Sequence, residues 1–153
     1  EAREGKVREL ELSASQLRYL FGDSASHAWS TGATSSLSDY VVGITPSSVA
    51  YRTWQVKPFP QGLAWAQGQT PTAQGTIRSR WPLGDNVFRL TIEAPDGTSG
   101  TVAVPTLGST RVIYLDGVEV WNGTAAVNGA TASATADGFV AFTDVTGTHT
   151  WAW

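Results

Sequence analysis

The pattern of apolar and polar positions changes character near residue 50. Before that point apolar residues recur at helical spacing, and after it apolar and polar residues alternate. A helix places every third or fourth residue on one face, whereas successive residues of a strand point to opposite faces. The chain is therefore predicted to begin with helical segments and to continue as a β-rich domain.

Two segments show the helical spacing. Within residues 4–21 the apolar side chains fall on one face: Val7, Leu10, Ala14, Leu17 and Phe21. The part from Val7 to Leu12 is equally compatible with a strand, and Gly22-Asp23-Ser24 ends the pattern. A second helix of about ten residues is predicted to begin near residue 34 and to end at Gly43. Its apolar face consists of Leu37, Tyr40, Val41 and Ile44.

The rest of the chain reads as short strands separated by turn residues. Residues 87–94 alternate strictly, with Phe88, Leu90 and Ile92 on one face. Asp116-Gly117 and Asp137-Gly138 are predicted as two-residue hairpin turns, in which both positions take a positive φ. The expected strands are Tyr51–Lys57, Leu63–Gln69, Gly75–Trp81, Val87–Ala94, Thr101–Val104, Arg111–Leu115, Val118–Trp121, Ala132–Ala136, Phe139–Phe142 and Gly147–Trp153.

Many short strands at this spacing predict a mainly β fold, an antiparallel β-sandwich with one or two short N-terminal helices. We expect one compact domain, in which residues 1–50 form a helical segment that packs on a sandwich of residues 51–153. The residues predicted to contribute to the interior or its margins are Phe88, Leu90, Ile92, Val112, Tyr114, Phe139, Val140 and Trp151. Phe139 and Val140 are adjacent, so they cannot both face the same side of a regular strand.

Composition narrows the functional classes. Charged residues make up 15% of the 153 residues and the formal net charge is -3. Without a basic cluster we expect no nucleic-acid partner, and without an apolar run of roughly 18 residues we expect no membrane span. Cysteine is absent, and His27 and His149 are far apart in the sequence. We therefore expect neither a metal site nor a cofactor.

The seven Trp residues are a candidate for carbohydrate recognition, because an exposed indole can stack on a sugar ring while a buried one is a core residue. Trp54, Trp65 and Trp81 are predicted to be core residues. Trp121 ends a hairpin strand beside the Asn122-Gly123-Thr124 sequon, so it is predicted to be exposed and to stack on sugar. The sequon predicts N-glycosylation at Asn122 and a secreted protein.

One stretch of the sequence, from Ser26 to Trp81, has a distinctive order of motifs. It begins with the tetrad His27 to Ser30 and contains a helix-like run that ends at Gly43-Ile44. The residues that follow are Pro46, Tyr51-Arg52-Thr53-Trp54, Pro58, Leu63-Ala64-Trp65, Pro71-Thr72 and Gly75. Their order and spacing resemble the C-terminal region of the α-L-rhamnosidases of glycoside hydrolase family 78, and the resemblance extends more weakly to residue 153. In that family the end of a helical barrel runs into a closing β-sandwich.

The resemblance implies a sugar contact for His27, because the matching His lies at the mouth of the family's barrel and an imidazole both donates to and accepts from hydroxyls. Trp29 would form an apolar wall beside it. The family's catalytic carboxylates lie on the barrel, which a chain of this length cannot contain. Asp96, Asp116 and Asp137 are also explained as turn residues, so no catalytic residue is predicted.

Two functions follow as alternatives. The first is a non-catalytic, lectin-like module that binds a rhamnose-containing or other plant or microbial polysaccharide through His27, Trp29 or Trp121. The second is a structural accessory domain that braces the catalytic barrel of a longer α-L-rhamnosidase.

Overall fold

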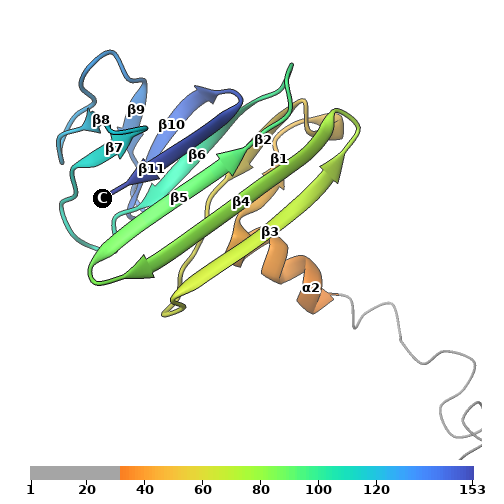
Figure 1. Cartoon of the computed structure of the whole chain (residues 1–153), viewed down its shortest axis with the longest axis horizontal. Helices are drawn as coiled ribbons and strands as arrows, with labels where there is room; N and C mark the ends of the chain where they lie inside the picture. The colour runs from red at the N-terminus through yellow and green to blue at the C-terminus, as the bar shows by residue number, and fades with distance from the viewer. Residues whose placement is uncertain (1–31) are drawn as a thin grey trace, which may run out of the picture. The chain divides into compact units, whose positions relative to one another are not determined.

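The structure, a computed structural model, describes residues 32–153 (Figure 1). Residues from Thr34 to Trp153 form one compact unit. The predicted helix within residues 4–21, the break at residues 22–24 and the candidate site residues His27 and Trp29 all lie outside the described residues. These expectations therefore remain predictions.

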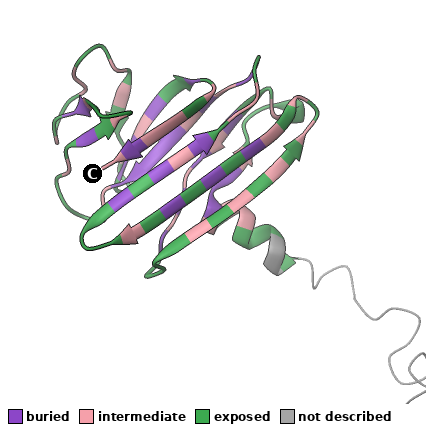
Figure 2. Cartoon of the chain, in the orientation of Figure 1, coloured by how far each residue is buried: buried purple, intermediate pink, exposed green. Residues whose placement is uncertain are grey.

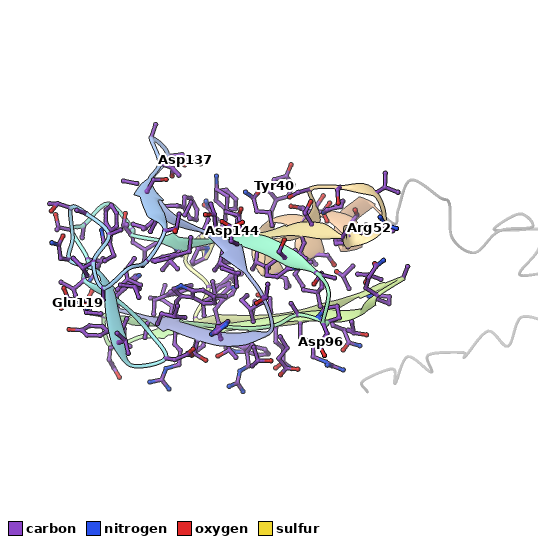
Figure 3. The ribbon with its side chains drawn as sticks, turned by 90° about the horizontal axis from the view of Figure 1, so that it is seen from above. Tyr40, Arg52, Asp96, Glu119, Asp137 and Asp144 are labelled. Carbon is purple, nitrogen blue, oxygen red and sulfur yellow. The ribbon has the colours of Figure 1, made fainter. Side chains whose placement is uncertain are left out.

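Two β-sheets form the fold, and Figure 3 shows them edge-on as two layers. The five-stranded sheet has the order β1 (Ile44–Pro46), β2 (Thr53–Val56), β6 (Ser99–Pro105), β10 (Phe139–Val145) and β9 (Ala132–Ala134). The six-stranded sheet has the order β3 (Trp65–Thr72), β4 (Gly75–Gly84), β5 (Val87–Glu93), β11 (Thr148–Ala152), β7 (Ile113–Leu115) and β8 (Val118–Trp121). The predicted mainly β sandwich is confirmed, although β2 and β6 pair in parallel.

The short helix predicted to end at Gly43 is also confirmed. It consists of an α-helical turn, α2 (Gly32–Ser36), and a π-helical segment, η2 (Leu37–Val42). Gly43 ends it with φ 85°, the left-handed conformation that glycine adopts without steric cost. Two short elements follow within the segment expected to be helical. They are the strand β1, which pairs with β2, and the 3₁₀ turn η3 (Val49–Tyr51).

The core lies between the sheets, and burial alternates along the strands as the sequence pattern predicts (Figure 2). The inward residues of β5 are fully buried, as are Trp54, Trp81 and Trp151. Phe139 and Val140 are both buried, but on opposite faces of β10. Val140 belongs to the core, whereas Phe139 lies outside the core cluster. Phe139 packs edge-to-face on Phe59, with the ring centroids 5.1 Å apart.

The prediction that Val112 and Tyr114 contribute to the interior is wrong. Val112 and Tyr114 are 38% and 42% exposed, because β7 begins only at Ile113 and turns that side chain inward. Tyr114 lies opposite Ala152 and Glu119 on the outer side of the sheet.

One of the two predicted hairpin turns is confirmed. Asp116 and Gly117 join β7 to β8 with φ values of 49° and 86°. The two-residue turn at Asp137-Gly138 is wrong, since β9 ends at Ala134 and the loop is longer. Thr135 N donates to Phe139 O at 2.8 Å across it, and of the two expected turn residues only Gly138 has a positive φ.

Candidate functional site

The outer face of the six-stranded sheet carries a cluster of polar side chains beside an exposed indole. Trp65, predicted to be a core residue, is 64% exposed, so that prediction is wrong. Trp54 and Trp81, predicted on the same grounds, are buried. The difference arises because β3 is the edge strand of its sheet and its odd-numbered residues point away from the core.

Strand register brings the polar residues into cross-strand rows. Trp65 lies opposite Pro82, Gln67 opposite Arg80 and Gln69 opposite Arg78. On the other side of β4, Arg80 lies opposite Thr91 and Arg78 opposite Glu93. Directly opposed residues of neighbouring strands have side chains in contact distance. These pairs therefore form one continuous surface across β3, β4 and β5.

This surface is hollowed. The hollow has a volume of about 490 Å³, a size typical of small-molecule sites. We call it the β3–β5 hollow; its outward-facing side chains are Gln67, Gln69, Arg78, Arg80, Thr91 and Glu93.

Hydrogen bonds hold one side of the hollow in place. Arg78 donates from Nε to Gln69 Oε1 and from NH1 to Glu93 Oε2, both at 3.2 Å. Beyond it, the hydroxyls of Thr91 and Thr150 are 3.1 Å apart. Within residues 32–153, the guanidinium groups of Arg80 and Arg89 form no ion pair. The hollow thus combines a pre-positioned Arg–Glu pair with Arg80, which forms no ion pair with another described residue, and Arg89 lies outside its lining.

The prediction that the Trp121 side chain is exposed is wrong. Its side chain is only 5% exposed, because the chain turns back after β8 and Trp121 bridges to Ala126. The indole lines another, smaller hollow of about 290 Å³ together with Arg111 and Thr135. The Arg111 guanidinium stacks on the Trp153 ring at 3.8 Å. Trp121 therefore offers no flat face to a sugar ring.

The sequon residue Asn122 is exposed at this turn. Its Oδ1 accepts hydrogen bonds from the backbone N–H groups of Thr124 and Ala125, at 3.0 and 2.9 Å, and from the Thr124 hydroxyl at 3.1 Å. This Asx turn gives Asn122 a structural role besides the predicted glycosylation.

The clearest titratable contact outside the hollow joins His149 and Asp116. His149 Nδ1 lies 2.6 Å from Asp116 Oδ2, and Thr150 N donates to Asp116 Oδ1 at 2.8 Å. Partial burial by itself would raise the pKa of Asp116, but the hydrogen bonds from His149 and Thr150 outweigh it and lower that pKa. The pair sits at a hairpin turn and so stabilises the fold locally.

Residues 32–153 lack the features of two other kinds of site. No three His, Asp or Glu side chains of this part of the chain lie close enough to hold a metal ion. No helix among the same residues is long and apolar enough to cross a membrane.

The site residues that sequence reasoning missed had left a recognisable signal. In Trp65–Thr72 the alternate residues Trp65, Gln67 and Gln69 form an aromatic and polar row. In Gly75–Gly84 the alternate residues Thr76, Arg78 and Arg80 form a polar row. Two such rows on consecutive strands predict one joint surface if the strands form a hairpin, and they do.

Comparison with known proteins places this sandwich. Residues 43–114 match the family described as the bacterial alpha-L-rhamnosidase C-terminal domain. The fold is similar to that of Streptomyces avermitilis alpha-L-rhamnosidase complexed with L-rhamnose, with a TM-score of 0.62, 20% sequence identity, and coverage of 76% of this chain and 10% of that chain. It is also similar to alpha-L-rhamnosidase from Dictyoglumus thermophilum, with a TM-score of 0.65, 17% identity, and coverage of 75% and 12%. No curated protein matches the chain.

At these identities the two structures establish a shared fold. The chain spans about a tenth of the length of each. The family match covers the segment from Gly43 at the end of η2 to Tyr114 in β7, and it confirms the resemblance inferred from the sequence. Over residues 43–114, the chain is therefore similar to the bacterial alpha-L-rhamnosidase C-terminal domain family.

Proposed function

We propose that this chain is a non-catalytic accessory domain that binds polysaccharide through the β3–β5 hollow and the adjoining Trp65. The observation that carries the proposal is the 64% exposure of Trp65 in the same sheet face as Gln67 and Arg80. Sugars present C–H faces that stack on an indole and hydroxyls that need amide and guanidinium partners. Trp65 supplies the indole and the adjoining hollow supplies the amide and guanidinium groups, all on one sheet.

The test is a binding screen against plant and microbial polysaccharides by affinity electrophoresis and calorimetry, with the Trp65→Ala variant. Loss of a stacking aromatic should cost about 1–2 kcal/mol, which corresponds to a decrease in affinity of roughly 5- to 30-fold. Tyr40→Ala is the matched control. Tyr40 is also exposed, but it lies on the side of the five-stranded sheet (Figure 3). A Trp65→Ala variant that binds as tightly as the parent chain would refute the proposal.

A specific observation also supports the structural alternative. The helical segment before β1 exposes Leu37 and Tyr40, and Val49 in η3 is 87% exposed. Leu37 and Tyr40 lie three residues apart in one helical segment, and exposed apolar patches are typical of contact surfaces. In a longer alpha-L-rhamnosidase that carries this chain, replacing Leu37 and Tyr40 with Ser should lower the melting temperature of the catalytic part. An unchanged melting temperature would leave polysaccharide binding as the surviving function.

The proposal includes an extracellular location, because polysaccharides of cell walls and matrices lie outside the cell. Immunodetection of the protein in culture medium and in cell lysate of its source tests this. Detection in the lysate alone would count against it.

A further inference from the structure

The outer face of the six-stranded sheet carries more positive than negative side chains, whereas the chain as a whole is negatively charged. The chain as a whole has a formal net charge of -3. On this face, β4 contributes Arg78 and Arg80, while β5 contributes Arg89 and Glu93. β3 and β11 contribute no charged side chain to it, and β8, at the far edge, contributes Glu119.

Pairing leaves two of the three arginines with their charge uncompensated. Arg78 is neutralised by Glu93 through the 3.2 Å ion pair. Arg80 and Arg89 form no ion pair with any residue of the described chain. Because Arg80 lies opposite Thr91, Arg89 is its diagonal neighbour on β5. The Cα atoms of such diagonal neighbours are about 7–8 Å apart. Two such guanidinium groups on one sheet attract a ligand with repeated negative charges.

The shape of the surroundings favours a carboxylate attached to a sugar. Arg80 lines the hollow between Gln67 and Thr91, so its planar fork faces an open, polar space. A guanidinium binds a planar carboxylate through two parallel hydrogen bonds. Trp65 lies next to Gln67 on the same face of β3, where a sugar ring held at Arg80 can stack on it.

We propose that the ligand of the β3–β5 hollow is an acidic polysaccharide, with a uronate carboxylate bound by Arg80 and an adjacent sugar ring stacked on Trp65. This inference rests on the proposed function, since it names the chemical class of the ligand at the same site. Arg78, in its pair with Glu93, also donates to Gln69 and so positions that side chain. Because Glu93 neutralises Arg78, the uncompensated positive charge of this face lies on Arg80 and Arg89.

The experiment compares polygalacturonate with the same polymer fully methyl-esterified, and with a neutral polysaccharide panel, by calorimetry at low and high salt. Polygalacturonate should bind, and esterification should weaken binding about tenfold or more, because a charged hydrogen-bonded pair is lost. Raising the ionic strength should weaken binding of the acid form only, since salt screens charge interactions.

Variants locate the site. Arg80→Gln should reduce affinity for polygalacturonate about tenfold, and Arg80→Lys should retain part of it, because Lys keeps the charge and loses the fork. Arg52→Gln is the matched control, since Arg52 is exposed on the side of the five-stranded sheet (Figure 3). Melting temperatures of all three variants should equal that of the parent chain.

The outcomes separate the two proposals. If esterified or neutral polymers bind as tightly as the acid form and Trp65→Ala weakens them, the acidic ligand is refuted and polysaccharide binding stands. If no polymer binds, both proposals fail. If polygalacturonate binds and Arg52→Gln weakens it as much as Arg80→Gln does, the assignment to this hollow is overturned.

Discussion

Gly100 lies directly opposite Trp54 in the parallel pair of β6 and β2, and the indole ring occupies the space that a side chain at Gly100 would need. A Cβ atom at this position would overlap Cε3, Cδ2 and Cζ3 of the ring. Trp54 is 1% exposed, and its Nε1 donates to Thr98 Oγ1 at 3.0 Å. The ring is therefore held from both sides and cannot move away without loss of core packing.

Gly100→Ala should consequently lower the free energy of unfolding by about 1–3 kcal/mol, the usual cost of overpacking a core. Gly84→Ala is the matched control. Gly84 also lies in a strand, but a Cβ there would meet open space, so its effect should stay within about 0.5 kcal/mol. Urea denaturation of both variants checks the difference, and equal stabilities would contradict the packing argument.

The buried and the exposed tryptophans should respond differently to truncation. Trp54→Ala should cost about 3–5 kcal/mol of stability, because it leaves a large cavity in the core. Trp65→Ala should cost less than about 1 kcal/mol, since the indole is mostly in solvent. Melting temperatures measure both changes. A large loss of stability in Trp65→Ala would show that the outer face is covered by another part of the chain.

The lowered pKa of Asp116 predicts a pH-dependent contribution to stability. Hydrogen bonds hold this pKa below its ordinary value of 3.8 in the folded chain. The contribution is therefore complete above the ordinary value and is lost as the pH falls through the lowered one. Asp116→Asn keeps a residue that tolerates the positive φ of this turn. It should reduce stability by at most about 1 kcal/mol at neutral pH, because the site is half exposed.

Denaturation at a series of pH values from neutral to acidic tests this sign. The difference between Asp116→Asn and the parent chain should shrink toward acid, and Asp96→Asn, at the exposed Asp96-Gly97 turn, provides the matched control. A difference that grows as the pH falls would show that the hydrogen bonds do not favour the ionised carboxylate.

Asn122 should carry an N-linked glycan when the chain is secreted from a eukaryotic host, because it is exposed and lies in a complete sequon. Asn122→Asp should abolish the added mass without loss of stability, since a carboxylate oxygen accepts the same three hydrogen bonds. Intact-mass spectrometry and thermal melting measure the two effects. An unmodified parent chain would mean that the Asx turn is the whole role of this residue.

The isolated chain should not hydrolyse aryl α-L-rhamnosides. Glycoside hydrolysis generally requires two carboxyl groups about 5–9 Å apart on either side of the sugar, and Glu93, the acidic residue of the hollow, is engaged by Arg78. A chromogenic assay tests this. Activity that disappears in Glu93→Gln would contradict the prediction and make the hollow an active site.

How much of this could be predicted from the sequence depends on how local each feature is. The alternation of Phe88, Leu90 and Ile92 fixes which face of β5 is buried, because the two-residue period is a property of the strand itself. Gly43 likewise predicts a helix end and Asp116-Gly117 predicts a hairpin, because only a few residue types, glycine above all, adopt left-handed conformations easily. Such features are decided within a few residues.

The sequence contains the residues of the candidate site but does not show that they lie together. The polar rows of residues 65–69 and 78–80 are in the sequence, but their meeting in one hollow depends on register between strands. The sequence by itself therefore determined the sandwich, the hairpin turn at Asp116-Gly117 and the resemblance to the alpha-L-rhamnosidase C-terminal domain. Only the tertiary structure decided that Trp65 is exposed while Trp54 and Trp121 are buried. Burial of a large side chain is decided by which strand lies at a sheet edge and which distant segment covers it, and both arise from contacts between residues far apart in the chain.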